Sequence, residues 1–172
     1  MKIFLLGLPG SGKTTLGKEL ASVFRVPFVD LDAEIEKSEG MTIKEIFLSK
    51  KEDYFRKAES VQLKNWAALK SDFVMASGGG TPCFFDNLSV MNTAGITVFI
   101  DVPPGEISKR IMNTALSDRP LFAKVHPENL KDQIEFMRSH RISYYRQARI
   151  ILTGAGVSSK EISDKIRKET QS

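Results

Sequence analysis

Residues 7–14 form a glycine-rich loop with the spacing of a phosphate-binding loop. They read Gly-Leu-Pro-Gly-Ser-Gly-Lys-Thr, which fits G-x-x-x-x-G-K-[ST] without a mismatch. Backbone N–H groups in such a loop surround phosphate oxygens at the positive end of the helix that follows. Lys13 would then reach the β- and γ-phosphates, and the Thr14 hydroxyl would ligate magnesium. The loop predicts bound nucleotide phosphate, but it does not identify the molecule that accepts the phosphoryl group.

Two carboxylates follow the second apolar run of the chain. Asp30 and Asp32 come directly after residues 26–29, which read as a strand. Because residues i and i+2 of an extended segment point to the same side, both carboxylates should face the ligand crevice at the end of that strand. The alternative is that Asp32 only caps a helix over 33–38. Asp101 ends a later strand and is interpreted as structural.

Three consecutive glycines, Gly78, Gly79 and Gly80, follow a strand predicted over 73–76. Such a run is entropically costly, so it indicates backbone that approaches another group closely or adopts positive φ. A flexible turn is the alternative interpretation.

Arginines occupy two predicted helices. Arg56 and Glu59 are i, i+3 neighbours on a helix predicted over 52–70, and taken alone they read as a surface ion pair worth a few tenths of a kcal/mol. Arg141 interrupts the apolar stripe of a helix predicted over 128–147, where an arginine should either extend its charge to water or meet an anion.

Residues 113–127 have no periodicity, although the chain before and after them does. A structureless stretch of about 15 residues is uncommon in a compact domain and is typical of a lid or binding loop. Arg119 lies in its middle, and Arg110 lies near the end of the preceding helix, predicted over 104–112.

Strand and helix patterns alternate through the chain and must position these residues. Apolar runs predict strands at 3–6, 26–29, 73–76, 96–100 and 149–152. Helical patterns cover 13–24, 33–38, 52–70, 86–94, 104–112 and 128–147, and capping boxes start further helices at Thr42 and Ser158. With right-handed crossovers this order predicts an α/β fold, a three-layer α/β/α sandwich around a five-stranded parallel sheet. The loop, both aspartates and the glycine triplet should then meet at one edge of that sheet.

Composition narrows the class of protein. The 172 residues suit one domain, and 41% hydrophobic with 27% charged residues is typical of a soluble globular protein. No apolar run approaches the roughly 20 residues of a membrane span, and the chain enters the loop too early for a cleavable signal, so we expect a cytosolic protein. The net charge of +4 comes without a run of like charges, so anionic small substrates explain it without nucleic acid. One cysteine and two histidines predict neither a disulfide nor a zinc site.

Together, these blocks resemble a shikimate kinase. The phosphate-binding loop is shared by many kinases, whereas the other blocks are specific in this order and spacing. The resemblance is carried by the loop at 7–14, Asp30-x-Asp32, Phe55-Arg56-x-x-Glu59, Gly78-Gly79-Gly80, Arg119-Pro120-Leu121 and Arg141-x-x-Tyr144-Tyr145-Arg146.

The resemblance implies ATP-dependent phosphorylation of the 3-hydroxyl of shikimate, giving shikimate 3-phosphate and ADP in aromatic amino acid (chorismate) biosynthesis. It implies one P-loop kinase domain over 1–172 with strand order 2-3-1-4-5, an acceptor-binding region at about 31–62 and a lid at about 113–127. It also implies ATP as co-substrate, Mg²⁺ as cofactor, a cytoplasmic location, and a monomer without nucleic-acid or membrane partners.

Residue roles follow from the same resemblance. Asp32 is expected to bind the hydroxyls of shikimate and to act as the base, with Lys13 and Arg119 as the cations that assist catalysis. Thr14 and Asp30 are expected to hold magnesium, the latter through water.

The binding residues are also carried over by position. Arg56 and Arg141 should grip the shikimate carboxylate, Glu59 should orient Arg56, and Arg110 should pack near adenine with the loop at 153–157. The full nucleotide set is Gly10, Ser11, Gly12, Lys13, Thr14, Thr15, Arg110 and Arg119. The full acceptor set is Asp32, Arg56, Gly78, Gly79, Gly80 and Arg141.

Two alternatives stay open. One is a related kinase acting on gluconate or a nucleoside monophosphate, although two arginines, one aspartate and bare glycine backbone suit a small hydroxylated carboxylate better. The other is a catalytically silent nucleotide-binding module, which would have no need to retain both a metal site and a candidate base.

Overall fold

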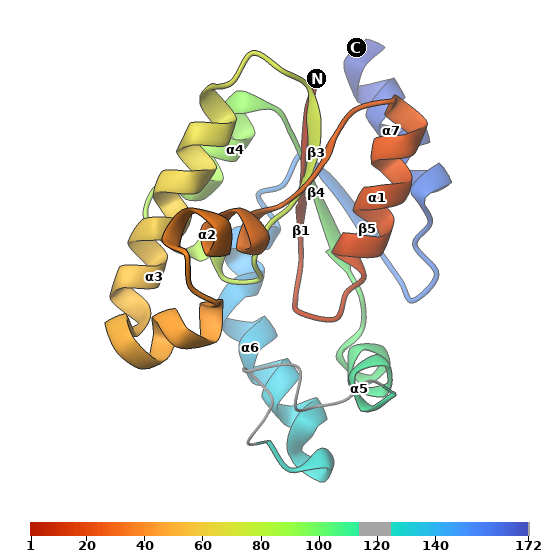
Figure 1. The fold of residues 1–172 in the computed structure, drawn as a ribbon. Helices are drawn as coiled ribbons and strands as arrows, with labels where there is room; N and C mark the ends of the chain where they lie inside the picture. The colour runs from red at the N-terminus through yellow and green to blue at the C-terminus, as the bar shows by residue number, and fades with distance from the viewer. Residues whose placement is uncertain (114–124, 172) are drawn as a thin grey trace.

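A five-stranded parallel sheet with the order β2-β3-β1-β4-β5 lies between two helical layers (Figure 1). The structure is a computed structural model and describes residues 1–113 and 125–171. The predicted fold class and strand order are both confirmed. The strands are β1 (Lys2–Leu6), β2 (Phe28–Asp30), β3 (Phe73–Ala76), β4 (Ile96–Asp101) and β5 (Ile150–Thr153).

The helices fall into two layers and an end group. One face of the sheet is covered by α1 (Lys13–Phe24) and α7 (Ser159–Gln171), and the other by α3 (Ile43–Ala68) and α4 (Asn87–Ala94), with α2 (Leu31–Glu39) packed on α3 (Figure 1). The end group, α5 (Pro104–Met112) and α6 (Leu130–Tyr145), packs together near the carboxyl ends of the strands, where β1 turns into α1. Short 3₁₀ turns are η1 (Thr81–Cys83) and η3 (Pro127–Asn129).

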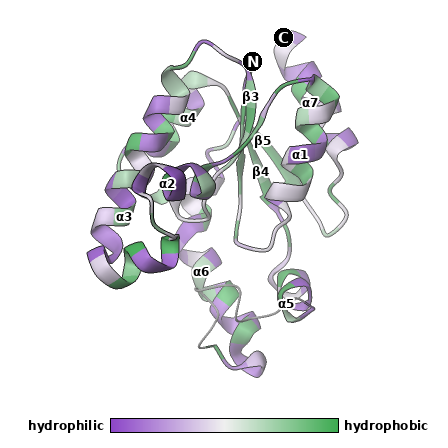
Figure 2. Cartoon of the chain, viewed as in Figure 1, coloured by the Kyte–Doolittle hydropathy of each residue, from purple (hydrophilic) through white to green (hydrophobic). Residues whose placement is uncertain are grey.

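The core follows from the apolar runs. Residues 3–6 of β1 are fully buried, as are residues 73–75 of β3, because helices cover both faces of these central strands. Figure 2 shows the same division, with hydrophobic strands inside and helices that carry hydrophilic residues on their outer sides.

The long helix α3 joins two segments that the sequence predicts separately. Its start is the capping box: the Thr42 hydroxyl accepts a hydrogen bond from the backbone N–H of Glu45 at 3.2 Å, and the Glu45 carboxylate accepts one from the Thr42 N–H at 2.7 Å. At Lys51 the backbone leaves the helical region (φ 69°, ψ 173°), and the predicted second helix continues from there. The Ser158 hydroxyl likewise caps α7, accepting from the Glu161 N–H at 3.2 Å.

Within the described parts of the chain, no helix is both long and apolar enough to cross a membrane.

A substitution at Gly95, between α4 and β4, would probe how tightly β4 packs beside β1. A Cβ at this position would collide with the backbone carbonyl of Lys2, whereas a Cβ at Gly105 in α5 meets nothing within 4 Å. We expect Gly95→Ala to lower the free energy of unfolding by about 2–3 kcal/mol, since an overpacked backbone contact must shift the strand. Gly105→Ala should be neutral or slightly stabilising. Urea unfolding of the two variants checks this, and equal stability would contradict it.

Candidate active site

The phosphate-binding loop connects β1 to α1 in a conformation that suits glycine. Gly7 and Gly12, the two glycines required by the motif, have φ of 147° and 96°, which residues with a side chain rarely adopt. A Cβ at Gly7 would also lie 2.8 Å from the carbonyl oxygen of Ile100. The motif therefore reflects backbone geometry at the amino end of α1.

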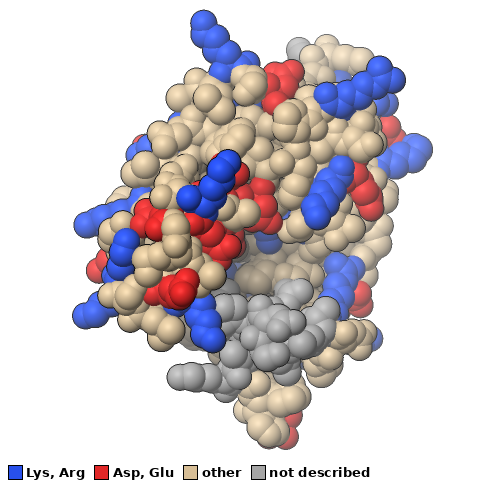
Figure 3. Space-filling view, in the orientation of Figure 1, with Lys and Arg blue, Asp and Glu red and all other residues tan. Residues whose placement is uncertain are grey.

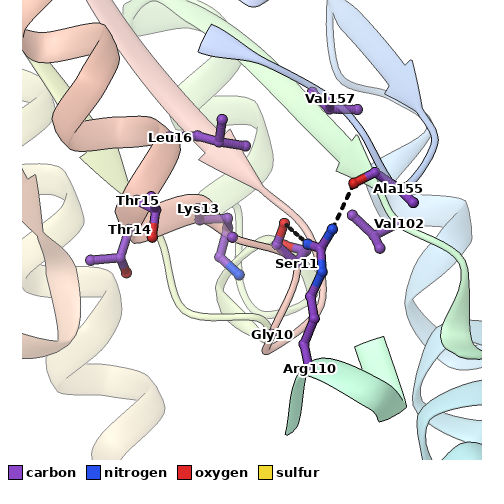
Figure 4. Close-up of a pocket in the computed structure, with 11 residues that line it drawn as sticks. Gly10, Ser11, Lys13, Thr14, Thr15, Leu16, Val102, Arg110, Ala155 and Val157 are labelled. Carbon is purple, nitrogen blue, oxygen red and sulfur yellow. Dashed lines mark hydrogen bonds between the residues drawn. The ribbon is translucent and has the colours of Figure 1, made fainter. Parts of the chain in front are cut away.

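A cleft of about 480 Å³ opens over this loop (Figure 4). All the predicted nucleotide-binding residues that the structure describes line it, together with an apolar wall. The lining residues are Gly10, Ser11, Gly12, Lys13, Thr14, Thr15, Leu16, Val102, Arg110, Ala155 and Val157. Of the wall, Ala155 and Val157 lie in the predicted adenine loop, whereas the sequence analysis missed Leu16 and Val102. Val102 directly follows β4, and its place at a strand end was the signal that could have found it.

Arg110 crosses the cleft from α5. Its Nη2 donates to the carbonyl oxygen of Ala155 at 2.6 Å and its Nη1 to that of Ser11 at 3.4 Å (Figure 4). Its Nε donates to the carboxylate of Glu106 at 2.9 Å. The side chain thus joins the phosphate-binding loop to the loop after β5, on the side of the cleft away from β2.

Lys13 is held directly over the loop. Its Nζ donates to the carbonyl oxygens of Gly7 at 2.9 Å and Leu8 at 3.0 Å, and the residue is buried. These bonds offset the desolvation of a buried ammonium and keep the charge where phosphate oxygens would lie.

Asp30 uses its two carboxylate oxygens differently. Oδ1 caps α2, accepting from the N–H groups of Asp32 at 3.1 Å and Ala33 at 3.4 Å, while Oδ2 lies 3.5 Å from the Thr14 hydroxyl. The alternative interpretation of Asp32, as a residue that only caps the helix, is therefore wrong, because Asp30 is the cap.

The pair of Thr14 and Asp30 suits magnesium. Mg²⁺ commonly takes a hydroxyl or one or two carboxylates from the protein, and completes its shell with water and substrate phosphates. The described residues contain no cluster of three or more Asp, Glu, His or Cys that could hold a metal by themselves. A hydroxyl beside a carboxylate at the phosphate-binding loop therefore fits a magnesium ion shared with a nucleotide.

Asp32 lies in the first turn of α2 and not on an extended segment, so the i, i+2 argument for its direction was wrong. Its Oδ1 atom is nevertheless buried, and it has no hydrogen-bond partner among the described residues. Burial, reinforced by the nearby carboxylates of Asp30 and Glu59, raises the pKa of Asp32 to about 6, while Lys13 and Arg56 oppose the shift. A carboxylate with such a pKa suits a general base near neutral pH.

Arg56 and Glu59 are buried, so their interpretation as a surface pair was wrong. Arg56 Nη1 donates to Glu59 Oε2 at 2.9 Å, and its Nε and Nη2 donate to Glu52 Oε1 at 3.1 Å each. The guanidinium also stacks over the ring of Phe84, 4.2 Å from its centroid.

The backbone of the glycine triplet lies directly against the side chains of Glu59 and Arg56. A Cβ at Gly78 would lie 2.9 Å from Glu59 Oε1, and one at Gly80 would lie 2.7 Å from the guanidinium nitrogens of Arg56. None of the three glycines has a positive φ. Close approach, and not an unusual backbone conformation, is therefore the reason for glycine at these positions.

The end of α6 supplies two further groups. Arg141 Nη1 is buried without a hydrogen-bond partner among the described residues, and it would lie 3.0 Å from a Cβ at Gly79. Tyr145 is fully buried and its hydroxyl donates to the Gly79 carbonyl at 2.5 Å. The sequence analysis gave Tyr145 no role, because an aromatic residue beside an apolar stripe reads as core.

Asp101 also bonds to α6. Arg138 Nη2 contacts its Oδ2 at 2.8 Å, which ties the end of β4 to the helix that carries Arg141. This agrees with the structural interpretation of Asp101. Arg119 and most of the predicted lid, residues 114–124, lie outside the described residues.

Charge is distributed unevenly around the site. On the face drawn in Figure 3, lysine and arginine are interspersed with aspartate and glutamate. At the site, Lys13, Arg56, Arg110 and Arg141 come from four elements, α1, α3, α5 and α6, and the carboxylates of Asp30, Asp32 and Glu59 lie among them.

The chain is similar in sequence to known shikimate kinases. A family model described as shikimate kinase matches residues 9–171. A shikimate kinase of Phocaeicola vulgatus is 43% identical over 86% of this chain and 83% of that protein, and one of Bacteroides fragilis is 41% identical over 88% and 83%.

Solved structures agree. Shikimate kinase from Bacteroides thetaiotaomicron has a TM-score of 0.87 at 34% identity, covering 99% of this chain and 97% of that one. Shikimate kinase from Acinetobacter baumannii, solved in complex with shikimate, has a TM-score of 0.86 at 30% identity, covering 99% and 92%.

The raised pKa of Asp32 predicts a pH-dependent gain in stability from Asp32→Asn. Because the neutral carboxyl is favoured in the folded protein, its stabilising contribution is full below pH 4 and is lost as the pH rises through 6. The amide cannot ionise, so the variant does not lose this stability. As the pH rises from 4.5 to 7.5, its free energy of unfolding should therefore increase by about 1–3 kcal/mol relative to that of the parent protein.

Thermal and urea unfolding with a chelator and without nucleotide would measure this difference. Asp53→Asn, which removes an exposed carboxylate on α3, is the control for the loss of one negative charge. If Asp32→Asn changes the free energy of unfolding equally at both pH values, the raised pKa of Asp32 is contradicted.

Proposed function

Because the chain belongs to the shikimate kinase family, whose members phosphorylate shikimate with ATP, we propose how its residues divide the work of that reaction. The observation that supports the assignment best lies in the acceptor region. Asp32 Oδ1 and Arg141 Nη1, a buried acceptor and a buried donor, both have no hydrogen-bond partner among the described residues. Buried polar atoms normally have partners, and the hydroxyls and carboxylate of shikimate offer complementary ones.

The donor side binds ATP. The backbone N–H groups at the amino end of α1 surround the phosphates, and Lys13 neutralises charge on the β- and γ-oxygens. Arg110, which joins the phosphate-binding loop to the loop after β5, packs against the adenosine end of the nucleotide. Val102 and Val157 give that end of the cleft an apolar surface.

Thr14 and Asp30 would hold magnesium. When bound, the ion stabilises negative charge on the β- and γ-phosphate oxygens. The division of Asp30 between the cap of α2 and the Thr14 hydroxyl keeps one carboxylate oxygen directed to this place.

The acceptor side grips a carboxylate with two arginines. Guanidinium forks fix both the position and the orientation of a planar anion, which an ammonium would not do. The three hydrogen bonds from Arg56 to glutamates leave two of its five N–H groups for a ligand. Arg141 approaches from α6 beside Gly79, so the two guanidinium groups flank the glycine triplet.

Asp32 acts as the base. The 3-hydroxyl oxygen of shikimate attacks the γ-phosphorus, the bond from this phosphorus to the bridging oxygen of ADP breaks, and the hydroxyl proton passes to Asp32. A pKa of about 6 leaves most of this carboxylate ionised at neutral pH. Most of the acceleration comes from alignment and from the surrounding cations, which are Lys13 and, by resemblance, Arg119.

We also propose a cytoplasmic monomer. Among the exposed apolar residues of the described part of the chain, Leu48 lies on α3, Phe136 on α6 and Phe85 between η1 and α4, so these three belong to different parts of the fold.

The direct test is a shikimate-dependent kinase assay. Purified protein with ATP and Mg²⁺ should form ADP at a rate that saturates with shikimate, and a coupled assay for ADP would measure it. Gluconate and a nucleoside monophosphate are the comparison acceptors. Turnover that depends on either of these, and not on shikimate, would overturn the proposal.

Arg141→Leu should chiefly weaken acceptor binding. A hydrogen bond to a charged group is worth about 1.5–3 kcal/mol, so KM for shikimate should rise by about 10- to 150-fold while KM for ATP changes less than about twofold. Arg146→Leu, an exposed arginine just past α6, is the matched control and should change neither constant. An unchanged KM for shikimate in Arg141→Leu would show that this arginine serves only packing.

A further inference from the structure

A buried hydroxyl lies behind the acceptor site, on the side of Glu59 opposite Arg56. Thr81 Oγ1 donates to Glu59 Oε1 at 2.6 Å, and both residues are fully buried. Thr81 directly follows the glycine triplet, whereas Glu59 belongs to α3, so the contact joins two walls of the site.

Thr81 is fixed in place by its backbone. Its N–H donates to the Gly78 carbonyl at 3.1 Å, and its own carbonyl accepts from Asn87 Nδ2 at 3.0 Å. Asn87, the first residue of α4, is itself fully buried. The hydroxyl therefore has a defined position from which to bond the carboxylate.

The two oxygens of Glu59 serve different partners. Oε1 accepts from Thr81, and Oε2 accepts from Arg56 Nη1 at 2.9 Å. A Cβ at Gly78 would lie only 2.9 Å from Oε1, so backbone closes the space beside that oxygen. Without the Thr81 hydroxyl, Oε1 would be a buried acceptor lacking this partner, and rotation of the carboxylate to find another partner would also move Oε2 away from Arg56.

The other contacts of Arg56 hold it less firmly. Glu52, which accepts from Nε and Nη2, has a side chain that is 54% exposed, and exposed pairs contribute little. The rings of Phe84 and Phe55 lie 4.2 Å and 5.0 Å from the Arg56 Cζ atom, and these cation–π contacts do not fix the direction of individual N–H groups. Among the hydrogen bonds described for Arg56, the one to Glu59 has a fully buried acceptor.

We propose that Thr81 is a positioning residue for the acceptor, acting through Glu59 on Arg56. Its hydroxyl holds the Glu59 carboxylate in one orientation, and this carboxylate holds the Arg56 guanidinium toward the shikimate carboxylate. The inference rests on the proposed function, because that function gives Arg56 its ligand.

Thr81→Val tests the role, because valine has a similar shape and lacks the hydroxyl. We expect KM for shikimate to rise by about 5- to 30-fold, the range that a lost buried hydrogen bond of about 1–2 kcal/mol gives, with KM for ATP within about twofold of the parent value. Thr81→Ser keeps the hydroxyl and should restore KM for shikimate. Thr93→Val, at an exposed threonine on α4, is the control and should change neither constant.

A second measurement separates positioning from general loss of packing. In an Arg56→Leu background, adding Thr81→Val should weaken shikimate binding by less than about twofold in calorimetric titration, because the residue through which Thr81 acts is gone. If valine lowers the melting temperature too far for assay, Thr81→Ala removes the same hydroxyl without placing a methyl group beside the Glu59 carboxylate, and it should show the same selective loss.

Other results would contradict either the role of Thr81 or the proposed function. If Thr81→Val leaves KM for shikimate unchanged, raises both KM values alike, or weakens binding equally in both backgrounds, Thr81 is structural and only this inference fails. If the parent protein shows no shikimate-dependent turnover, the proposed function fails and this inference falls with it.

Discussion

The pairing of β1 between β3 and β4 is the constraint on which the rest of the structure depends. It puts the phosphate-binding loop at the centre of the carboxyl edge of the sheet, at the point where the chain order reverses, which is where ligands bind in open α/β sheets. The β2 and β3 side of the loop carries Asp30 and the glycine triplet. The β4 and β5 side carries Arg110 with the loop after β5. The order of the strands thus separates the proposed acceptor half of the site from the proposed donor half.

The acceptor half is made of buried charge. Arg56 and Glu59 are taken out of water, and they are tolerated because their hydrogen bonds compensate one another and because the glycines let backbone close around them. Asp32 is compensated less well, since burial and two neighbouring carboxylates act against its ionised form. The ionised form of Asp32 therefore lowers the stability of the folded protein, as is common for residues of a binding site whose missing partner is the substrate.

Helix α6 contacts both halves of the site. Arg138 bonds Asp101 at the end of β4, and one to two turns later Arg141 and Tyr145 reach the glycine triplet after β3. A displacement of α6 would therefore be felt at both strand ends.

The sequence by itself determined the phosphate-binding loop, the alternation of strands and helices, and the caps at Thr42 and Ser158, because each depends on contacts within a few residues of chain. Its resemblance to a known family added the strand order and the residues of the site. Only the tertiary structure decided that Arg56 and Glu59 are buried, that Asp30 rather than Asp32 caps α2, and that Thr81 bonds a carboxylate 22 residues earlier in the chain. Burial, pKa and hydrogen-bond partners depend on side chains from other elements, and local spacing does not contain that information.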